Sequence, residues 1–170
     1  MQNPITTIDL GHSSSPDAVP TPWEETRRVL ETAEIYWLAT VRADGRPHVT
    51  PVKPAWVDGT LYVSTGSIAQ KLKNLRGNPH VVLTTGCNHL EPGLDIVVEG
   101  DVVPLTDVAV SERLYQTWAI QWGEGWPILL RDGVFYDKNS GETLLVFSVT
   151  LTKIFAYARG DQWSQTRYQF

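Results

Sequence analysis

The sequence predicts a single α+β domain in which a mostly antiparallel barrel of six or more strands is flanked by two or three helices. Short apolar runs rich in β-branched and aromatic residues recur along the chain, and Asp44-Gly45 and Asp58-Gly59 separate three of them. Asp-Gly between such runs is typical of a hairpin, because glycine accepts a positive φ without steric cost. Other segments show helical spacing. With 170 residues, the chain is long enough to bury a substantial core.

Composition narrows the class of protein. The net charge of −5 argues against a general nucleic-acid or anionic-membrane binder. Cys87 is the only cysteine, so no intrachain disulfide can form. The first residues show no basic segment followed by an apolar core, and no run approaches the ~20 apolar residues of a membrane span. We therefore expect a cytoplasmic protein that binds neither nucleic acid nor membrane.

The chain is expected to begin with a flexible arm and a helix. Residues 1–20 are rich in Ser, Pro, Thr and Gly and show no periodicity, so the domain proper should span 21–170. Thr21 is a suitable helix cap, Pro22 suits the first helical position, and Glu24 completes a capping box. This helix should reach about Glu34, with inward-facing positions that include Thr26, Leu30 and Ala33.

A three-strand meander is expected next, from the runs Tyr36–Val41, His48–Val57 and Leu61–Ser64. Pro47, Pro51 and Pro54 interrupt the second run, and proline cannot donate to a ladder. This strand therefore cannot be paired regularly along both edges. Its free backbone groups could serve a ligand, or it could be an ordinary edge strand protected from aggregation.

The third run leads into a short helix through Ser64-Thr65-Gly66-Ser67. Ser67 is a candidate N-cap, and exposed amides at a helix start attract a phosphate or carboxylate. The buried stripe should comprise Ile68, Leu72 and Leu75, which places Lys71 at its border. We predict an anion site, with the alternative of a serine-capped surface helix; the predicted residues are Ser64, Thr65, Ser67 and Lys71.

The remainder should alternate strands with one further helix. We expect strands over His80–Thr85 and Leu94–Val103, with a bulge at Gly100 in the second. A helix capped by Thr106 should run to about Trp122. A loop over Gly123–Gly133 should follow it, and the closing strands are expected over Thr143–Thr150 and Lys153–Ala158.

The sequence contains no motif for several common kinds of catalytic or binding site. No G-x-S-x-G elbow and no G-x-G-x-x-G turn occur, and Cys87-x-His89 lacks further ligands at metal-site spacing. No acid–base constellation stands out, so we predict no catalytic side chains and no metal site. This pattern agrees with an enzyme whose cofactor supplies the redox chemistry.

An ordered set of motifs carries a family resemblance. The set comprises Leu-Ala-Thr-Val-Arg, Asp-Gly-Arg-Pro-His-Val-Thr-Pro-Val, Leu-Tyr-Val-Ser-Thr-Gly, Lys-x-x-Asn-Leu-x-x-Asn-Pro-x-Val and Leu-Asp-Ile-Val-Val-Glu-Gly-Asp-Val, with Thr-Arg-Tyr-Gln-Phe at the end. It resembles the pyridoxamine-phosphate-oxidase-like, FMN-binding split β-barrel flavoproteins. Within them it is most similar to the small deazaflavin (coenzyme F420)-dependent reductases. The resemblance covers roughly residues 22–170 and implies a split β-barrel.

The resemblance also implies a cofactor site between the two subunits of a homodimer. F420 or, alternatively, FMN would place its phosphate near Lys71 and its ring along a strand that offers backbone hydrogen bonds. The ring strand would be Val49, Thr50, Pro51 and Val52. Arg167 and Tyr168 would lie near the pocket, or the chain end could dock onto its own barrel. Gln70 stands where relatives often have a basic residue, and Lys53-Pro54 where they are often apolar or aromatic.

The expected function is an oxidoreductase that transfers hydride between F420 and a small conjugated substrate. One alternative is an FMN-dependent oxidoreductase of the same family. Another is a protein that binds or carries a cofactor or a tetrapyrrole without turnover. A third is a scaffold that has lost its cofactor.

Overall fold

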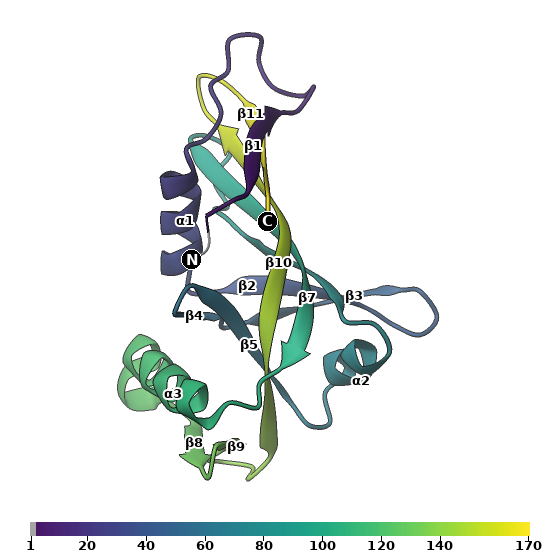
Figure 1. The fold of residues 1–170 in the computed structure, drawn as a ribbon, viewed down its shortest axis with the longest axis vertical. Coiled ribbons are helices and arrows are strands. Elements are labelled where there is room, and N and C mark those ends of the chain that lie inside the picture. Colours follow the sequence, from purple (N-terminus) through teal and green to yellow (C-terminus); the bar gives the residue numbers. More distant parts are fainter. Residues whose placement is uncertain (1–2) are drawn as a thin grey trace.

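The computed structural model describes residues 3–170 and shows one extended antiparallel sheet with three α-helices (Figure 1). The helices are α1 (Trp23–Thr32), α2 (Gln70–Gly77) and α3 (Val108–Trp122), and a 3₁₀ turn η1 (Gly123–Gly125) follows α3. The strands are β1 (Thr6–Leu10), β2 (Tyr36–Val41), β3 (Pro47–Val52), β4 (Ala55–Val57), β5 (Thr60–Gly66), β6 (His80–Thr85), β7 (Gly93–Pro104), β8 (Ile128–Arg131), β9 (Val134–Asp137), β10 (Thr143–Arg159) and β11 (Ser164–Gln169).

The sheet is organised around β10, which pairs with β7, β11, β5 and β9 along its length. The main path runs β1-β11-β10-β7-β6-β2-β3 and every pairing is antiparallel. Among the described residues β1 and β3 end this path without pairing with each other, so the sheet is not closed. This is the α+β architecture expected of a split β-barrel.

Glycine at position 100 permits a close approach between β7 and β10. A Cβ atom there would lie 2.4 Å from the Thr150 carbonyl oxygen. The predicted bulge does exist, but on the opposite strand: the register shifts between Leu151 and Lys153, which face Gly100 and Glu99. The two closing strands predicted from the sequence are therefore one continuous strand with a bulge.

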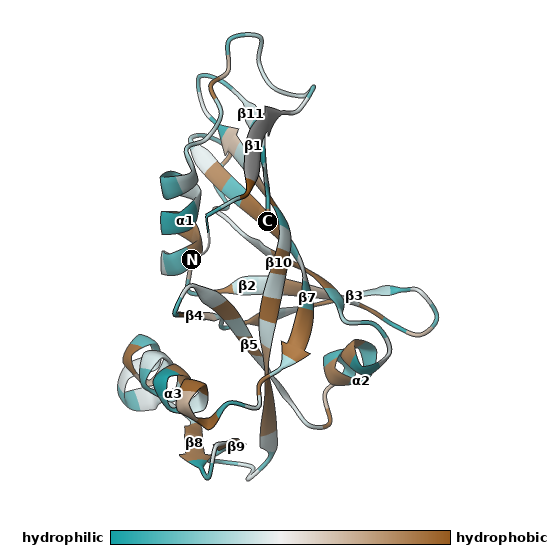
Figure 2. Ribbon diagram, viewed as in Figure 1, coloured by the Kyte–Doolittle hydropathy of each residue, from teal (hydrophilic) through white to brown (hydrophobic). Residues whose placement is uncertain are grey.

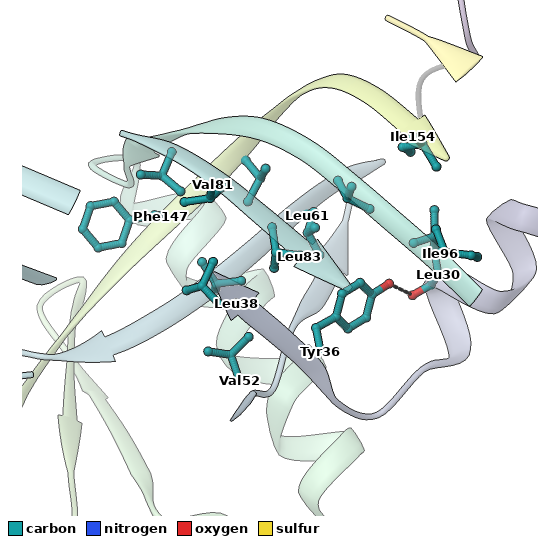
Figure 3. Close-up of a cluster of buried hydrophobic side chains, with 14 of the residues drawn as sticks. Leu30, Tyr36, Leu38, Val52, Leu61, Val81, Leu83, Ile96, Phe147 and Ile154 are labelled. Carbon is teal, nitrogen blue, oxygen red and sulfur yellow. Dashed lines mark hydrogen bonds between the residues drawn. The ribbon is translucent and has the colours of Figure 1, made fainter. Parts of the chain in front are cut away.

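Two hydrophobic clusters form the core. The larger packs the sheet against α1 and α2. Figure 3 shows Leu38 near Leu83, Ile96 beside Leu30, and the Tyr36 hydroxyl bonded to the Leu30 carbonyl at 2.6 Å. The smaller lies under α3, where Leu114 and Trp118 face β4, β8 and β9. Figure 2 shows the hydrophobic residues concentrated on the strands, whereas α1 shows hydrophilic turns toward solvent.

Both longer helices begin differently from expectation. The cap position of α1 is Pro22, without a side-chain cap, and Thr21 donates its backbone N–H to the Thr166 hydroxyl at 2.9 Å. The α3 cap is Asp107, not Thr106, and its carboxylate accepts from the amides of Ala109 and Val110. The inward positions Thr26 and Leu30 of α1 are buried as predicted.

The predicted meander is instead two separate hairpins. The second run breaks at Lys53-Pro54 into β3, which pairs with β2, and β4, which pairs with β5. Asp58 and Gly59 both adopt positive φ in the β4–β5 turn, as the Asp-Gly signal requires. A further hairpin, β8–β9, begins inside the segment that was expected to be a loop.

The first 20 residues also differ from expectation. Within the described part of this segment, β1 pairs with β11, and the Gly11 amide donates to the Gln165 carbonyl at 2.9 Å. Backbone pairing of this kind needs no side-chain periodicity, so the composition gave no sign of it. None of the helices in the described chain is long and apolar enough to cross a membrane.

Candidate functional site

The predicted ring-binding strand is β3, which pairs only with β2 among the described residues. Its outward positions are Pro47, Val49 and Pro51, whereas Thr50 and Val52 turn inward. Backbone groups alternate between the two edges of a strand, and the prolines cannot donate to β2. Val49 therefore directs its N–H and C=O toward the free edge, beside the Pro47 and Pro51 carbonyls.

This geometry separates the roles of the four predicted ring residues. A flat ligand laid along the free edge would meet one backbone donor, from Val49, and several carbonyl acceptors. Thr50 and Val52 use their backbone groups toward β2, so Thr50 can contribute only its hydroxyl. Val52 is 7% exposed and belongs to the core.

Lys71 lies in the first turn of α2 and reaches toward β3. Its Nζ is 3.5 Å from the Thr50 hydroxyl. Half-burial of the side chain lowers the pKa of Lys71 below its ordinary value of 10.5. No carboxylate among the described residues lies within ion-pair distance of this ammonium. A partly desolvated, unpaired cation beside a free strand edge is suited to bind an anion.

Asn74 was not predicted as a site residue, yet it fixes α2 to the sheet. Its amide donates to the Thr40 hydroxyl of β2 at 2.9 Å and accepts from Gln70 at 2.8 Å. The i, i+4 spacing of Gln70 and Asn74 was the available signal. This contact sets the position of Lys71, which lies between the two residues on the same helix. Gln70 therefore has a structural partner within the helix.

The turn before α2 holds a carboxylate from a distant strand. Glu142, next to the start of β10, accepts from the Ser67 hydroxyl at 3.2 Å and from the Ile68 amide at 3.1 Å. Ser67 is therefore not the N-cap, and α2 begins only at Gln70, after Ala69. Leu72 and Leu75 are buried as predicted, but Ile68 is 79% exposed because it lies in this turn.

The predicted anion-site residues do not converge on one point. Ser64 and Thr65 are neighbours on β5 and point to opposite faces of the sheet. Thr65 is buried, whereas Ser67 turns to Glu142 and Lys71 turns to β3. Of the four, Lys71 is the residue whose surroundings favour an external anion. Glu142 could not be predicted, because only the β5–β10 pairing brings it to this turn.

The end of the chain docks onto its own barrel at Tyr168. This side chain is fully buried, donates to the Thr21 carbonyl and shares a 2.9 Å hydrogen bond with the Thr26 hydroxyl. Its ring lies 5.1 Å from that of Trp23. Tyr168 thus has no surface to offer a ligand, which favours the predicted alternative that the chain end docks onto its own barrel. Arg167 points the other way and is exposed.

A shallow cavity of about 340 Å³ adjoins β3. Five residues line it: Ile35, Pro51, Val52, Lys53 and Trp122. Two of them belong to the predicted ring strand, and Trp122 comes from the end of α3. No local pattern indicated that Trp122 lies beside β3, because the two segments are far apart in the chain.

Comparison with known families identifies the chain. The pyridoxamine 5'-phosphate oxidase model matches residues 22–155, which is more than half of the sequence. The chain belongs to this family. The comparison with curated proteins gave no match.

Solved structures of similar fold agree with this membership. A conserved hypothetical protein from Mycobacterium tuberculosis is 18% identical with a TM-score of 0.66, covering 89% of each chain. An FAD-binding protein from Mesorhizobium loti is 19% identical with a TM-score of 0.58, covering 88% of this chain and 96% of that one. A heme-binding protein from Mycobacterium smegmatis is 15% identical with a TM-score of 0.60, covering 87% and 58%. At these identities the likeness concerns the fold.

Proposed function

We propose that this family member is an oxidoreductase that binds coenzyme F420, with FMN as the alternative cofactor. The observation that carries the proposal is the half-buried ammonium of Lys71, which has no carboxylate partner in the described chain and lies 3.5 Å from the Thr50 hydroxyl. Both cofactors contain a phosphate, and a charge-assisted contact to it would satisfy this cation. The family match and the sequence motifs support the same cofactor class.

The residues of the proposed site form two groups, one that binds the phosphate and one that orients the ring. Lys71 and the Thr50 hydroxyl would bind the phosphate, while the free edge of β3 at Val49 would orient the ring through backbone hydrogen bonds. When bound, the cofactor supplies hydride transfer to or from a small conjugated substrate. The protein supplies binding, orientation and exclusion of water, which is the usual division of labour in cofactor enzymes.

At the phosphate itself, leaving aside the glutamyl carboxylates of F420, the charge favours F420 over FMN. A phosphomonoester such as that of FMN carries nearly two negative charges at neutral pH, whereas the phosphodiester of F420 carries one. The Glu142 carboxylate in the turn before α2 repels the dianion more strongly than the monoanion. The single cation at Lys71 also matches one negative charge better than two.

The proposed assembly is a homodimer with the cofactor between the subunits. The outward face of the β2–β3 hairpin is apolar and exposed, and its cross-strand pairs are Trp37 with Pro51, Ala39 with Val49, and Val41 with Pro47. A hollow of about 420 Å³ continues this face across β6 and β7. A second copy on this face would cover the apolar surface and enclose the free edge of β3.

Replacing Val49 with Asp tests the assembly, because it places a charge at the centre of this face. We expect wild-type protein to sediment as a dimer in analytical ultracentrifugation and the variant to sediment as a monomer. Val134→Asp, at an exposed position of β9, is the matched control and should remain dimeric. A wild-type monomer at micromolar concentration would contradict the proposal.

Titration with F420 and, separately, with FMN tests the cofactor. Seven tryptophans provide a fluorescence signal that a bound flavin or deazaflavin would quench. Tight quenching by F420 alone is the expected result. Tight quenching by FMN alone would establish the alternative, and binding of neither would exclude both.

A second candidate is non-enzymatic tetrapyrrole binding, because a protein of similar fold binds heme. Titration with hemin, followed by the Soret band, separates the two functions. A shifted, saturable band without quenching by either flavin-type cofactor would favour the carrier.

A further inference from the structure

The cavity beside β3 combines an apolar floor with a cation. Pro51 and Ile35 contribute apolar surface, and the Lys53 ammonium lies 3.8 Å from the centre of the Trp122 ring. Lys53 follows the last residue of β3 and precedes Pro54, whose fixed φ restricts the backbone there. The cation therefore stands at the end of the strand on which we place the cofactor ring.

The position of the Trp122 ring, which lines the cavity, is fixed by the residues that pack against it. Trp122 is the last residue of α3, and Gly123 ends the helix with a φ of +66°. The Trp122 and Trp126 rings are 5.3 Å apart, and Trp126 is buried against Trp118. This packing restricts the indole before any ligand arrives, which reduces the entropy lost on binding.

We propose that this cavity is a binding site for a planar organic anion, namely a conjugated or aromatic carboxylate. The proposal rests on the proposed function in one respect: such a ligand would be the hydride acceptor or donor. Pro51 and Val52 line the cavity and also belong to the ring strand, so a molecule bound here would lie beside the cofactor. Reacting atoms must approach to about 3–3.5 Å for transfer, and this adjacency allows it.

The charge of the ligand follows from the surroundings of Lys53. No carboxylate of the described chain lies within ion-pair distance of its ammonium, which is partnered by an indole ring. An apolar floor lowers the local dielectric and strengthens attraction to an anion. The shape of the ligand follows from the Pro51 ring and from the part of Trp122 that lines the cavity and is not covered by Lys53, since flat π-systems pack against such surfaces.

Binding of 2-naphthoate and its uncharged analogue 2-naphthamide tests the proposal by calorimetry on cofactor-free protein. Wild-type protein should prefer the carboxylate. Lys53→Gln should weaken 2-naphthoate about tenfold and leave 2-naphthamide unchanged. Lys73→Gln is the matched control, because it removes the same charge from an exposed position on α2, and it should change neither affinity. Trp122→Ala should weaken both compounds, since it removes apolar surface from the cavity wall.

Three results would overturn the proposal. Equal binding of the two compounds to wild-type protein would show that charge is not recognised, and equal losses in the Lys53 and Lys73 variants would indicate general electrostatics. A Lys53→Gln variant that loses cofactor affinity while keeping 2-naphthoate affinity would place Lys53 in the cofactor site. Thermal unfolding of each variant shows that it is folded.

The same protein samples separate this proposal from the cofactor assignment. Lysine-dependent binding of 2-naphthoate without binding of F420 or FMN would support the anion site and exclude the proposed function. Cofactor binding without any binding of 2-naphthoate would support the proposed function and exclude the anion site.

Discussion

The Glu142 carboxylate accepts a hydrogen bond from the Ser67 hydroxyl at 3.2 Å, although 75 residues separate them in the chain. The same oxygen accepts from the Ile68 amide, and a Cβ atom at Gly66 would lie 2.5 Å from it. An anion of the protein itself therefore occupies the turn where the sequence predicted an external one. In the proposed function, the phosphate of the cofactor is therefore left with Lys71 and the Thr50 hydroxyl.

Removing the charge of Glu142 should improve FMN binding. Glutamine can still accept from Ser67 and Ile68, so Glu142→Gln keeps the turn while it removes the repulsion of a dianionic phosphate. We expect FMN affinity to increase about three- to tenfold by fluorescence quenching, F420 affinity to increase less, and riboflavin, which has no phosphate, to be unaffected. Glu112→Gln on the exposed side of α3 makes the same change in net charge and serves as control. An equal gain in the control would point to net charge alone.

Replacing Lys71 with Ala should weaken the binding of a phosphate-containing cofactor. The expected loss is about 1.5–3 kcal/mol, the scale of a charge-assisted hydrogen bond. Riboflavin affinity should change little, which distinguishes loss of the phosphate contact from damage to the ring site. Unchanged F420 and FMN affinity in this variant would remove Lys71 from the site.

The lowered pKa of Lys71 predicts that cofactor affinity and protein stability change in opposite directions as pH rises. As pH rises through this lowered pKa, below 10.5, the ammonium loses its proton and cofactor affinity should fall. Over the same pH range the free energy of unfolding of the cofactor-free protein should rise with pH. The reason is that the unfolded chain binds the Lys71 proton more tightly than the folded chain does. Titrations and denaturant melts at several pH values measure both. Lys71→Met should lack both dependences; a variant that keeps them would assign them to another group.

Asn74→Ala should destabilise the protein by about 1–3 kcal/mol, because it leaves the buried Thr40 hydroxyl without its donor and detaches α2 from β2. Urea unfolding measures this loss. Cofactor affinity should also fall, since Lys71 is carried by the same helix. Asn88→Ala, in an exposed loop, should do neither. A stable Asn74 variant would show that α2 is held by Leu72 and Leu75 alone.

Tyr168→Phe should cost about 1 kcal/mol of stability and leave cofactor affinity unchanged. The hydroxyl forms hydrogen bonds with the Thr21 carbonyl and the Thr26 hydroxyl, and the ring packs against Trp23. Chemical denaturation and cofactor titration on the same protein sample report both quantities. A loss of affinity without a loss of stability would return Tyr168 to the cofactor site.

Local signals in the sequence determined much of the fold. The Asp58-Gly59 turn, the strand over His80–Thr85 and the buried positions Leu72 and Leu75 all follow from neighbours within a few residues, and the structure confirms them. Pro47 and Pro51 also revealed that β3 cannot be paired regularly on both edges, because a missing N–H is a property of the residue itself. The family resemblance then supplied the split barrel, which local patterns alone could not.

The tertiary structure decided which side chains meet. Glu142 reaches Ser67 because β10 pairs with β5, and Trp122 reaches Lys53 because α3 packs beside β4. Tyr168 was equally compatible with a pocket or with the core, and its burial under α1 settled the matter. Contacts of this kind depend on strand register and helix packing across more than 60 residues of chain in each case. Propensity and spacing act over a few residues, so they carry no information about such pairs.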